Sequence, residues 1–167
     1  MGSKSELGEP IRVYTDGSCH PQSGSGGWAA IVLADGEKIE LTGTGSGTNH
    51  QRMELMAALE AIRHLQRNKF CHRKILLYTD SQYLVGLSRR QERLVLREFS
   101  TRKNKPVRNT DLILPLLEYL DTLSLELIKV SAHEKASDSE NFNRTVDKTA
   151  RKIVRREVQN AGKLENL

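Results

Sequence analysis

Apolar and polar residues alternate near the start of the chain, which predicts β-strands. The segment 11–16 shows the two-residue period of a strand, and apolar runs at 28–33 and 38–42 predict two more strands. Asp35-Gly36 lies between the last two runs, and this dipeptide between strand-like segments is a strong hairpin signal. We therefore expect the fold to begin with an antiparallel meander.

The hydrophobic period then changes to that of a helix. From residue 51 to residue 67, apolar side chains recur on one helical face. The later patterns predict a buried strand at 74–79, a short helix at 82–87 and a basic stretch at 89–108. A helix at 111–123, an alternating strand at 124–130, a polar loop at 132–143 and a basic helix at 145–158 follow. This order of strands and helices indicates an α/β fold, a mixed sheet with helices packed on it.

Length and composition narrow the class of protein. The 167 residues fit one domain, and 37% hydrophobic with 28% charged residues exclude a disordered chain. No stretch reaches the ~18 apolar residues of a membrane span, and the first residues lack the apolar core of a secretory signal. Cys19 and Cys71 follow no metal-ligand spacing and are too few for a disulfide scaffold, so we expect reduced thiols in a cytoplasm. The net charge of +5 suits a polyanionic partner.

A repeated tripeptide marks two strands. Residues 12–19 read RVYTDGSC and residues 76–83 read LLYTDSQY, so Asp16 and Asp80 are each predicted to end a strand. Ligands of α/β sheets gather outside the carboxyl ends of the strands. Two such carboxylates lie side by side if the strands are parallel neighbours. Each aspartate alone is also compatible with turn capping, but the matched pair weakens that interpretation.

Two further acids have a weaker local signal. Glu54 falls on the inward face of the first helix, where a carboxylate is costly unless it is paired or bound to a metal; a rim position open to water is the alternative. Asp147 lies near the start of the last helix, where the helix dipole already explains an acid. Several carboxylates without cysteine or histidine ligands favour a hard cation such as Mg²⁺. Two such ions ~3.5–4 Å apart can promote phosphodiester cleavage.

The motifs YTDGSC, RMELMAA and TDSQY, then a loop histidine and an aspartate opening the last helix, resemble type 1 ribonuclease H from about Ile11 to Arg156. The resemblance implies a five-stranded mixed sheet, three antiparallel strands with parallel additions, flanked by helices. It implies endonucleolytic hydrolysis of the RNA strand of RNA/DNA hybrids, leaving 5′-phosphate and 3′-hydroxyl ends. By the resemblance, the ligands of two Mg²⁺ ions, for which Mn²⁺ can substitute, are Asp16, Glu54, Asp80 and Asp147. His133 would be the loop histidine that assists proton transfer or product release.

The resemblance also implies the substrate contacts. The residues that match readers of the RNA 2′-hydroxyl are Gly17, Ser18, Cys19, Gln22, His50, Gln51 and Gln82. Asn109, joined by Thr48 or Asn49, matches a position that holds a phosphate of the DNA strand. A basic stretch resembles the basic protrusion of many members and consists of Arg89, Arg90, Arg93, Arg97, Arg102, Lys103, Lys105 and Arg108. Such cations neutralise backbone phosphates and make affinity fall with salt.

The chain departs from the family pattern at several of these positions. His50 stands where the family usually has asparagine, and Phe99 is the aromatic residue of a stretch that carries several tryptophans in bacterial members. The loop from His133 to Asp147 is longer than usual, and Arg144 replaces an expected acid. We therefore expect a mostly electrostatic grip on the DNA strand and a mobile loop histidine.

These patterns give a domain plan and leave competing functions. We expect a leader at 1–10, beginning with three residues typical of a cloning remnant, a ribonuclease H domain at 11–160 and a tail at 161–167. The short ends favour a free-standing enzyme, and we expect a monomer whose partner is the hybrid and not a membrane. The alternative is a non-catalytic or altered-specificity nucleic-acid-binding member of the same fold. A proofreading exonuclease is disfavoured because Ser18 stands where a second acid is needed.

Overall fold

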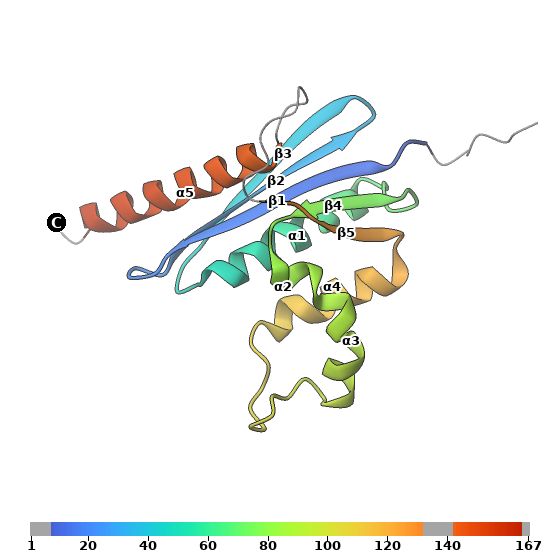
Figure 1. Ribbon diagram of the computed structural model, residues 1–167. Helices are drawn as coiled ribbons and strands as arrows, with labels where there is room; N and C mark the ends of the chain where they lie inside the picture. The colour runs from blue at the N-terminus through green and yellow to red at the C-terminus, as the bar shows by residue number, and fades with distance from the viewer. Residues whose placement is uncertain (1–7, 132–141, 165–167) are drawn as a thin grey trace, which may run out of the picture.

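One mixed sheet forms the centre of the structure (Figure 1). The computed structural model describes residues 8–131 and 142–164, and in these ranges five strands pair in the order β3-β2-β1-β4-β5. Their bounds are β1 Ile11–His20, β2 Ser25–Ala34, β3 Glu37–Gly45, β4 Ile75–Thr79 and β5 Leu125–Lys129. The first three strands pair antiparallel, while β4 pairs parallel with β1 and β5 parallel with β4. This arrangement confirms the predicted fold class.

Helices cover both faces of the sheet (Figure 1). Their bounds are α1 His50–Arg67, α2 Gln82–Val85, α3 Leu87–Leu96, α4 Thr110–Thr122 and α5 Phe142–Leu164. The larger hydrophobic cluster joins the sheet to α1 and α4. A smaller cluster joins the opposite face to α5, because Ala29 and Ile31 of β2 pack against Val146 and Ala150. The alternation of side chains along β2 thus supplies a core on each side.

The larger hydrophobic cluster fixes α1 against the sheet. Leu55, Leu59 and Ile62 are fully buried against Ile11 and Val13 of β1. Burying one such side chain contributes about 1.5–3 kcal/mol relative to exposure. The helix that carries Glu54 is therefore held firmly beside the strand that carries Asp16.

The predicted hairpin between β2 and β3 is confirmed. Ala34 pairs with Glu37, and the two turn residues Asp35 and Gly36 both have positive φ angles, of 53° and 78°. Two positive angles are the mark of a type I′ turn, whose twist matches that of the flanking strands. The Arg73 guanidinium donates a hydrogen bond to Asp35 Oδ1 at 2.7 Å and so anchors this turn.

Several boundaries differ from the prediction. Asp16 was expected to end its strand, but β1 continues to His20 because its pairing with β2 extends to His20↔Ser25. Only the pairing with β4 stops earlier, at Tyr14. Helix α5 starts at Phe142, inside the expected loop, and continues to Leu164 rather than ending at residue 158. Residues 132–141, including His133, lie outside the described ranges.

Candidate active site

The pairing register of two neighbouring strands explains the repeated Tyr-Thr-Asp. Tyr14 and Tyr78 are partners in the parallel pair of β1 and β4, and their rings stack with centroids 4.8 Å apart and planes 12° from parallel. Continuing the same register places Asp16 and Asp80 next to each other. Asp80 follows directly after β4, whereas Asp16 remains in β1. The repeat is therefore a device for bringing two carboxylates together.

Gly17 allows the third carboxylate to approach. A Cβ atom at this position would lie 2.3 Å from the backbone nitrogen of Glu54 and 2.4 Å from the carbonyl carbon of Met53. Real side chains do not tolerate such distances, so only glycine lets the first turns of α1 rest on β1. Its own N–H donates to Asp16 Oδ1 at 2.8 Å. Gly17 thus sets both the position of Glu54 and the rotamer of Asp16.

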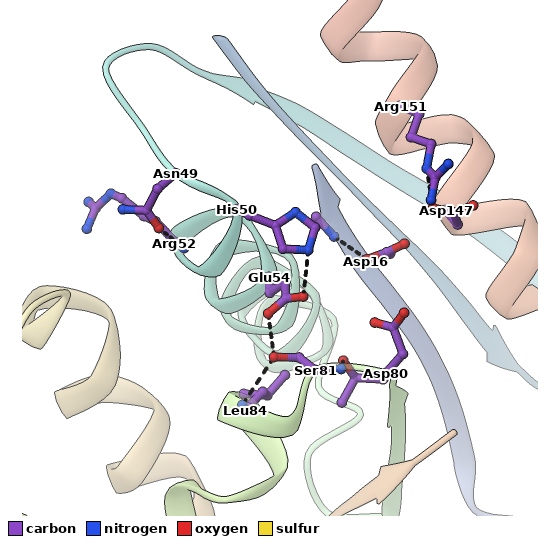
Figure 2. Close-up of polar contacts among 12 residues, drawn as sticks. Asp16, Asn49, His50, Arg52, Glu54, Asp80, Ser81, Leu84, Asp147 and Arg151 are labelled. Carbon is purple, nitrogen blue, oxygen red and sulfur yellow. Dashed lines mark hydrogen bonds and ion pairs between the residues drawn. The ribbon is translucent and has the colours of Figure 1, made fainter. Parts of the chain in front are cut away.

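Three carboxylates form one cluster (Figure 2). Asp16, Glu54 and Asp80 each offer an oxygen, and these oxygens lie within 4.8 Å of one another. Asp16 and Glu54 are only 8% and 9% exposed. Burial, followed by the charge of Asp80, raises the pKa of Asp16 to about 7. The pKa of Asp80 is raised as well, first by burial and then by Glu54. Both shifts express first the cost of burying a carboxylate and then the repulsion from its acidic neighbours.

Glu54 is held from two sides (Figure 2). The Ser81 hydroxyl donates to Glu54 Oε2 and accepts a hydrogen bond from the Leu84 N–H at 3.2 Å, which caps α2. On the other side, His50 Nε2 lies 3.1 Å from Glu54 Oε1. The hydrogen bond to Glu54 raises the pKa of His50. The carboxylate therefore has a fixed direction before any ligand arrives.

Asp147 stands apart from the three-carboxylate cluster. It comes from α5, and its Oδ1 lies 2.7 Å from Nε of Arg151, one turn further along the helix. Figure 2 shows this pair beside Asp16, on the side away from Glu54. The charge of Asp147 still contributes to raising the pKa of Asp16 and of Asp80. It is therefore close enough to act on the cluster but is not a member of it.

The residues matched to 2′-hydroxyl readers lie on four segments. Gly17, Ser18 and Cys19 continue β1 beyond Asp16, and Gln22 is exposed in the turn before β2. His50 and Gln51 form the first turn of α1, and an exposed Gln82 opens α2. Gly17 contacts Asp16 and His50 contacts Glu54, whereas Gln22 lies six residues beyond Asp16; His133 lies outside the described residues.

The loop before α1 separates the roles of Thr48 and Asn49. The side chain of Asn49 accepts a hydrogen bond from the Arg52 N–H at 2.9 Å and caps α1. Thr48 is anchored through its N–H to Gly24 at 3.0 Å, while its buried hydroxyl has no partner among the described residues. The same holds for the side-chain NH₂ of Asn109, which precedes α4. Thr48 and Asn109 therefore each retain a buried hydrogen-bonding group without a partner in the described ranges, whereas the side-chain oxygen of Asn49 is engaged in the cap.

The basic stretch is an exposed arm. We call residues 87–108 the basic arm; it comprises α3 and the turns after it. Its cations are exposed except Arg90, which is partly buried, stacks 4.0 Å above the Tyr83 ring and donates to Gly86 O at 3.1 Å. Leu96 is 84% exposed at the end of α3. The arm thus presents positive charge to solvent, and Arg90 is engaged within the protein.

Sequence reasoning missed three supporting residues. Ser81 was noticed only as a residue after Asp80, although serine at a helix start signals a cap and so fixes its hydroxyl near α2. Arg52 had no assigned role, but its Nη2 lies 2.7 Å from Asp111 Oδ2 and joins α1 to α4. Gly17 was assigned to substrate approach, and no local pattern indicated its contact with α1.

The donor set fits hard divalent cations. The cluster offers carboxylate oxygens, which Mg²⁺ and Ca²⁺ prefer, and the two cysteines are free thiols. A cation bound between Asp16 and Asp80 would offset both the burial and the mutual repulsion that raise their pKa values. A mixed sheet that carries such a cluster defines a class of divalent-metal-dependent nucleases.

Comparisons with known proteins agree with this class. The chain matches the family model described as RNase H over residues 8–155. Ribonuclease H of Chlorobium phaeobacteroides is 36% identical over 147 residues, covering 87% of this chain and 95% of that relative. Ribonuclease H of Caldanaerobacter subterraneus is 35% identical over 157 residues, covering 90% and 95%. The chain belongs to the RNase H family, as the sequence motifs indicated.

Solved structures share the fold. LC9-RNase H1, described as a type 1 RNase H with the type 2 active-site motif, has a TM-score of 0.72 at 22% identity, covering 90% of this chain and 74% of that chain. LC11-RNase H1, solved in complex with RNA/DNA hybrid, has a TM-score of 0.64 at 17% identity, covering 89% and 99%. In the part of the chain that the structure describes, no helix is both long and apolar enough to cross a bilayer.

Proposed function

We propose that this protein is an endoribonuclease that hydrolyses the RNA strand of RNA/DNA hybrids with two Mg²⁺ ions, for which Mn²⁺ can substitute. The observation that carries the proposal is the cluster of Asp16, Glu54 and Asp80 in a chain of the RNase H family. When bound, such ions supply an activated water and stabilise the leaving oxygen in phosphodiester cleavage. The products would carry 5′-phosphate and 3′-hydroxyl ends.

Each carboxylate would contribute to ion binding in a different way. Asp16 and Asp80 lie at neighbouring strands and would hold a metal cation between them. The cation would offset the repulsion between the two carboxylates. Ser81 keeps one oxygen of Glu54 oriented, so the carboxylate enters the site in a fixed rotamer. Asp147 would complete the set once a cation competes with Arg151 for it. His133 is assigned to proton transfer or product release by its match to the family loop histidine.

Substrate recognition follows from the groups around the cluster. Gly17, Ser18 and Cys19 present backbone beside Asp16, and the side chains of Gln22, Gln51 and Gln82 offer amides that can read a 2′-hydroxyl. His50 takes the position where relatives of the family usually have asparagine. The hydrogen bond to Glu54 raises the pKa of His50, and histidine, like asparagine, has a nitrogen that can donate a hydrogen bond at this position.

The DNA strand would be held by separate groups. Thr48 and Asn109 have buried polar atoms without partners among the described residues, and a phosphate oxygen would satisfy both. In this loop we assign the phosphate contact to Thr48, whose buried hydroxyl has no partner among the described residues, while the side-chain oxygen of Asn49 caps α1. The exposed cations of the basic arm would neutralise further phosphates: Arg89, Arg93, Arg97, Arg102, Lys103, Lys105 and Arg108.

We further propose a monomer that works in the cytoplasm. The support for the compartment is the pair of free thiols, Cys19 and Cys71, which a reducing environment preserves. Both thiols are partly buried, and burial raises the pKa of each, which lowers their reactivity.

One assay tests the activity. The protein is incubated with an RNA/DNA hybrid, an RNA duplex and single-stranded RNA, each with Mg²⁺, with Mn²⁺ and with chelator. We expect cleavage of the hybrid alone, and only with metal. A hybrid that stays intact in both metals would contradict the proposal and favour a non-catalytic hybrid-binding protein.

A further inference from the structure

Helix α5 carries a dense positive charge that the catalytic cluster does not use. Its sequence contains seven lysines and arginines and two carboxylates; seven minus two gives the helix a formal charge of +5, equal to that of the whole chain. The basic arm, by contrast, is the surface that the family resemblance assigns to phosphate binding. The charge of α5 therefore needs its own explanation.

The cations of α5 lie on its solvent face. Lys148, Lys152, Arg155 and Arg156 are all exposed, and the ion pairs among the described residues include none of them. Lys148, Lys152 and Arg156 succeed one another at intervals of four residues, so they form one row along the helix. Like charges at this spacing oppose helix formation. The row is thus a local cost that a bound polyanion would remove.

The apolar face of α5 is already occupied. Val146 and Ala150 are fully buried, and Val154 is 7% exposed. Gly27 of β2 allows the close approach, since a Cβ there would lie 2.9 Å from the carbonyl oxygen of Ala150. An amphipathic helix binds a membrane by burying its apolar face in lipid. Because that face packs on the sheet, α5 can offer only its charged face to a partner.

Both ends of α5 adjoin the elements of the candidate active site. Near its start, Asp147 and Arg151 lie beside Asp16, on the side away from Glu54 (Figure 2). Near its end, Glu157 and Leu164 line a groove of about 480 Å³ with Ser46, two residues before Thr48. The cationic row from Lys148 to Arg156 runs between these two places. It spans about 12 Å along the helix axis, over which a duplex presents about seven phosphates.

We propose that the solvent face of α5 is a second phosphate-binding surface, which holds the part of a long RNA/DNA hybrid that extends outside the catalytic cleft. This proposal rests on the proposed function, since it assumes that the hybrid is the substrate. Charge, exposure and position all match a polyphosphate backbone, and no base-reading group is needed. The surface adds affinity for long hybrids and leaves short ones unaffected.

The test compares two charge-removal variants on hybrids of two lengths. Lys152→Gln with Arg156→Gln removes two charges from the row; Arg67→Gln with Lys69→Gln removes two exposed charges at the far end of α1 as a matched control. Binding to hybrids of about 8 and about 24 base pairs is measured by fluorescence anisotropy over a salt series, in an Asp80→Asn background that prevents cleavage. Thermal melts verify that each variant is folded, and Lys148→Gln serves as a second, independent probe of the row.

We expect the α5 variant to bind the long hybrid about fivefold to tenfold more weakly and to lower the salt slope by about 1 to 2, one per lost phosphate contact. The short hybrid and the control variant should change by less than about twofold. The proposal would be overturned if the α5 variant lost equal affinity for the long and the short hybrid, or lost no affinity at all. So would a selective loss of binding to vesicles of phosphatidylserine and phosphatidylcholine with hybrid binding intact. A wild-type protein that binds long hybrids through α5 but cleaves none would instead contradict the proposed function alone.

Discussion

The carboxylate cluster and the basic arm carry opposite charges and are built in opposite ways. Asp16 and Glu54 are about nine-tenths buried, and they sit on β1 and α1, which the main hydrophobic core joins. The arm exposes nearly all its cations, and Leu96 at the end of α3 is 84% exposed. A metal site needs positions correct to a fraction of an ångström. Phosphate neutralisation needs only charge at the right place on the surface.

The largest expected effect is on the cluster itself. Asp80→Asn removes one cation-binding oxygen between two neighbouring strands, so hybrid cleavage should fall by at least about 10³-fold, or roughly 4 kcal/mol of transition-state stabilisation. Hybrid binding should stay within about tenfold, roughly 1.4 kcal/mol. Single-turnover cleavage and anisotropy binding measure the two quantities. A binding loss much larger than tenfold in a folded variant would mean that Asp80 chiefly contacts substrate.

The next effect concerns geometry without any loss of charge. Gly17→Ala places a methyl group 2.3 Å from the Glu54 nitrogen, so α1 must move. We expect a destabilisation of about 1–3 kcal/mol and a drop in kcat of about 10²-fold, since misplacement by about 1 Å can cost that much. Denaturant unfolding and steady-state kinetics are the measurements. Gly162→Ala, whose added methyl group meets nothing within 4 Å, is the control; it should leave kcat unchanged and raise stability by at most about 1 kcal/mol, the helix propensity of alanine over glycine.

Ser81→Ala removes the hydroxyl that orients Glu54 and caps α2. Loss of an orienting partner of a metal ligand lowers metal affinity or activity by about 10-fold to 100-fold. We expect kcat to fall in this range with little change in KM. Ser81→Thr keeps the hydroxyl and should restore most of the activity. If the threonine variant is as slow as the alanine variant, the hydroxyl does not act through Glu54.

The basic arm should respond more gently. Arg93→Gln with Arg97→Gln removes two exposed charges, so KM for a hybrid should rise a few-fold while kcat stays within about twofold, as weak surface electrostatics predict. The dependence of KM on salt should also become shallower, by about one unit in slope per phosphate contact. A fall in kcat comparable to that of Gly17→Ala would remove the distinction between the two regions.

The smallest effect is a pH dependence of stability in the metal-free protein. The pKa of Asp16 is raised to about 7 from an ordinary value near 4, so its protonated form stabilises the fold below about pH 4, and this contribution is lost as pH rises through 7. The raised pKa values of Asp80 and His50 act in the same direction. We expect the melting temperature in chelator to fall between pH 5 and pH 8, and Asp16→Asn to flatten that fall. A rise over this range would contradict the crowded-carboxylate account.

Local patterns predicted much of this molecule. The alternation of 11–16, the Asp35-Gly36 turn and the helical face around Glu54 each rest on short-range chemistry, and the structure confirms them. The repeated Tyr-Thr-Asp indicated paired carboxylates, which the register of β1 and β4 brings together.

What escaped prediction depends on contacts between segments distant in sequence. The extension of β1 to His20 follows from pairing with β2, and the role of Gly17 follows from the approach of α1. The bond between Ser81 and Glu54 joins residues on two helices. No pattern within one segment encodes such neighbours.

The central claim is that neighbouring strands deliver Asp16 and Asp80 to one cation site, and calorimetric titration with Mg²⁺ tests it most directly. At pH 6 a carboxyl group with a pKa of about 7 is mostly protonated, so cation binding must release close to one proton. Titrations in two buffers of different ionisation enthalpy count that proton. We predict near-stoichiometric release by the wild-type protein and a much smaller release by Asp16→Asn. Mg²⁺ binding that releases no proton, or that Asp16→Asn leaves unchanged, would contradict the claim.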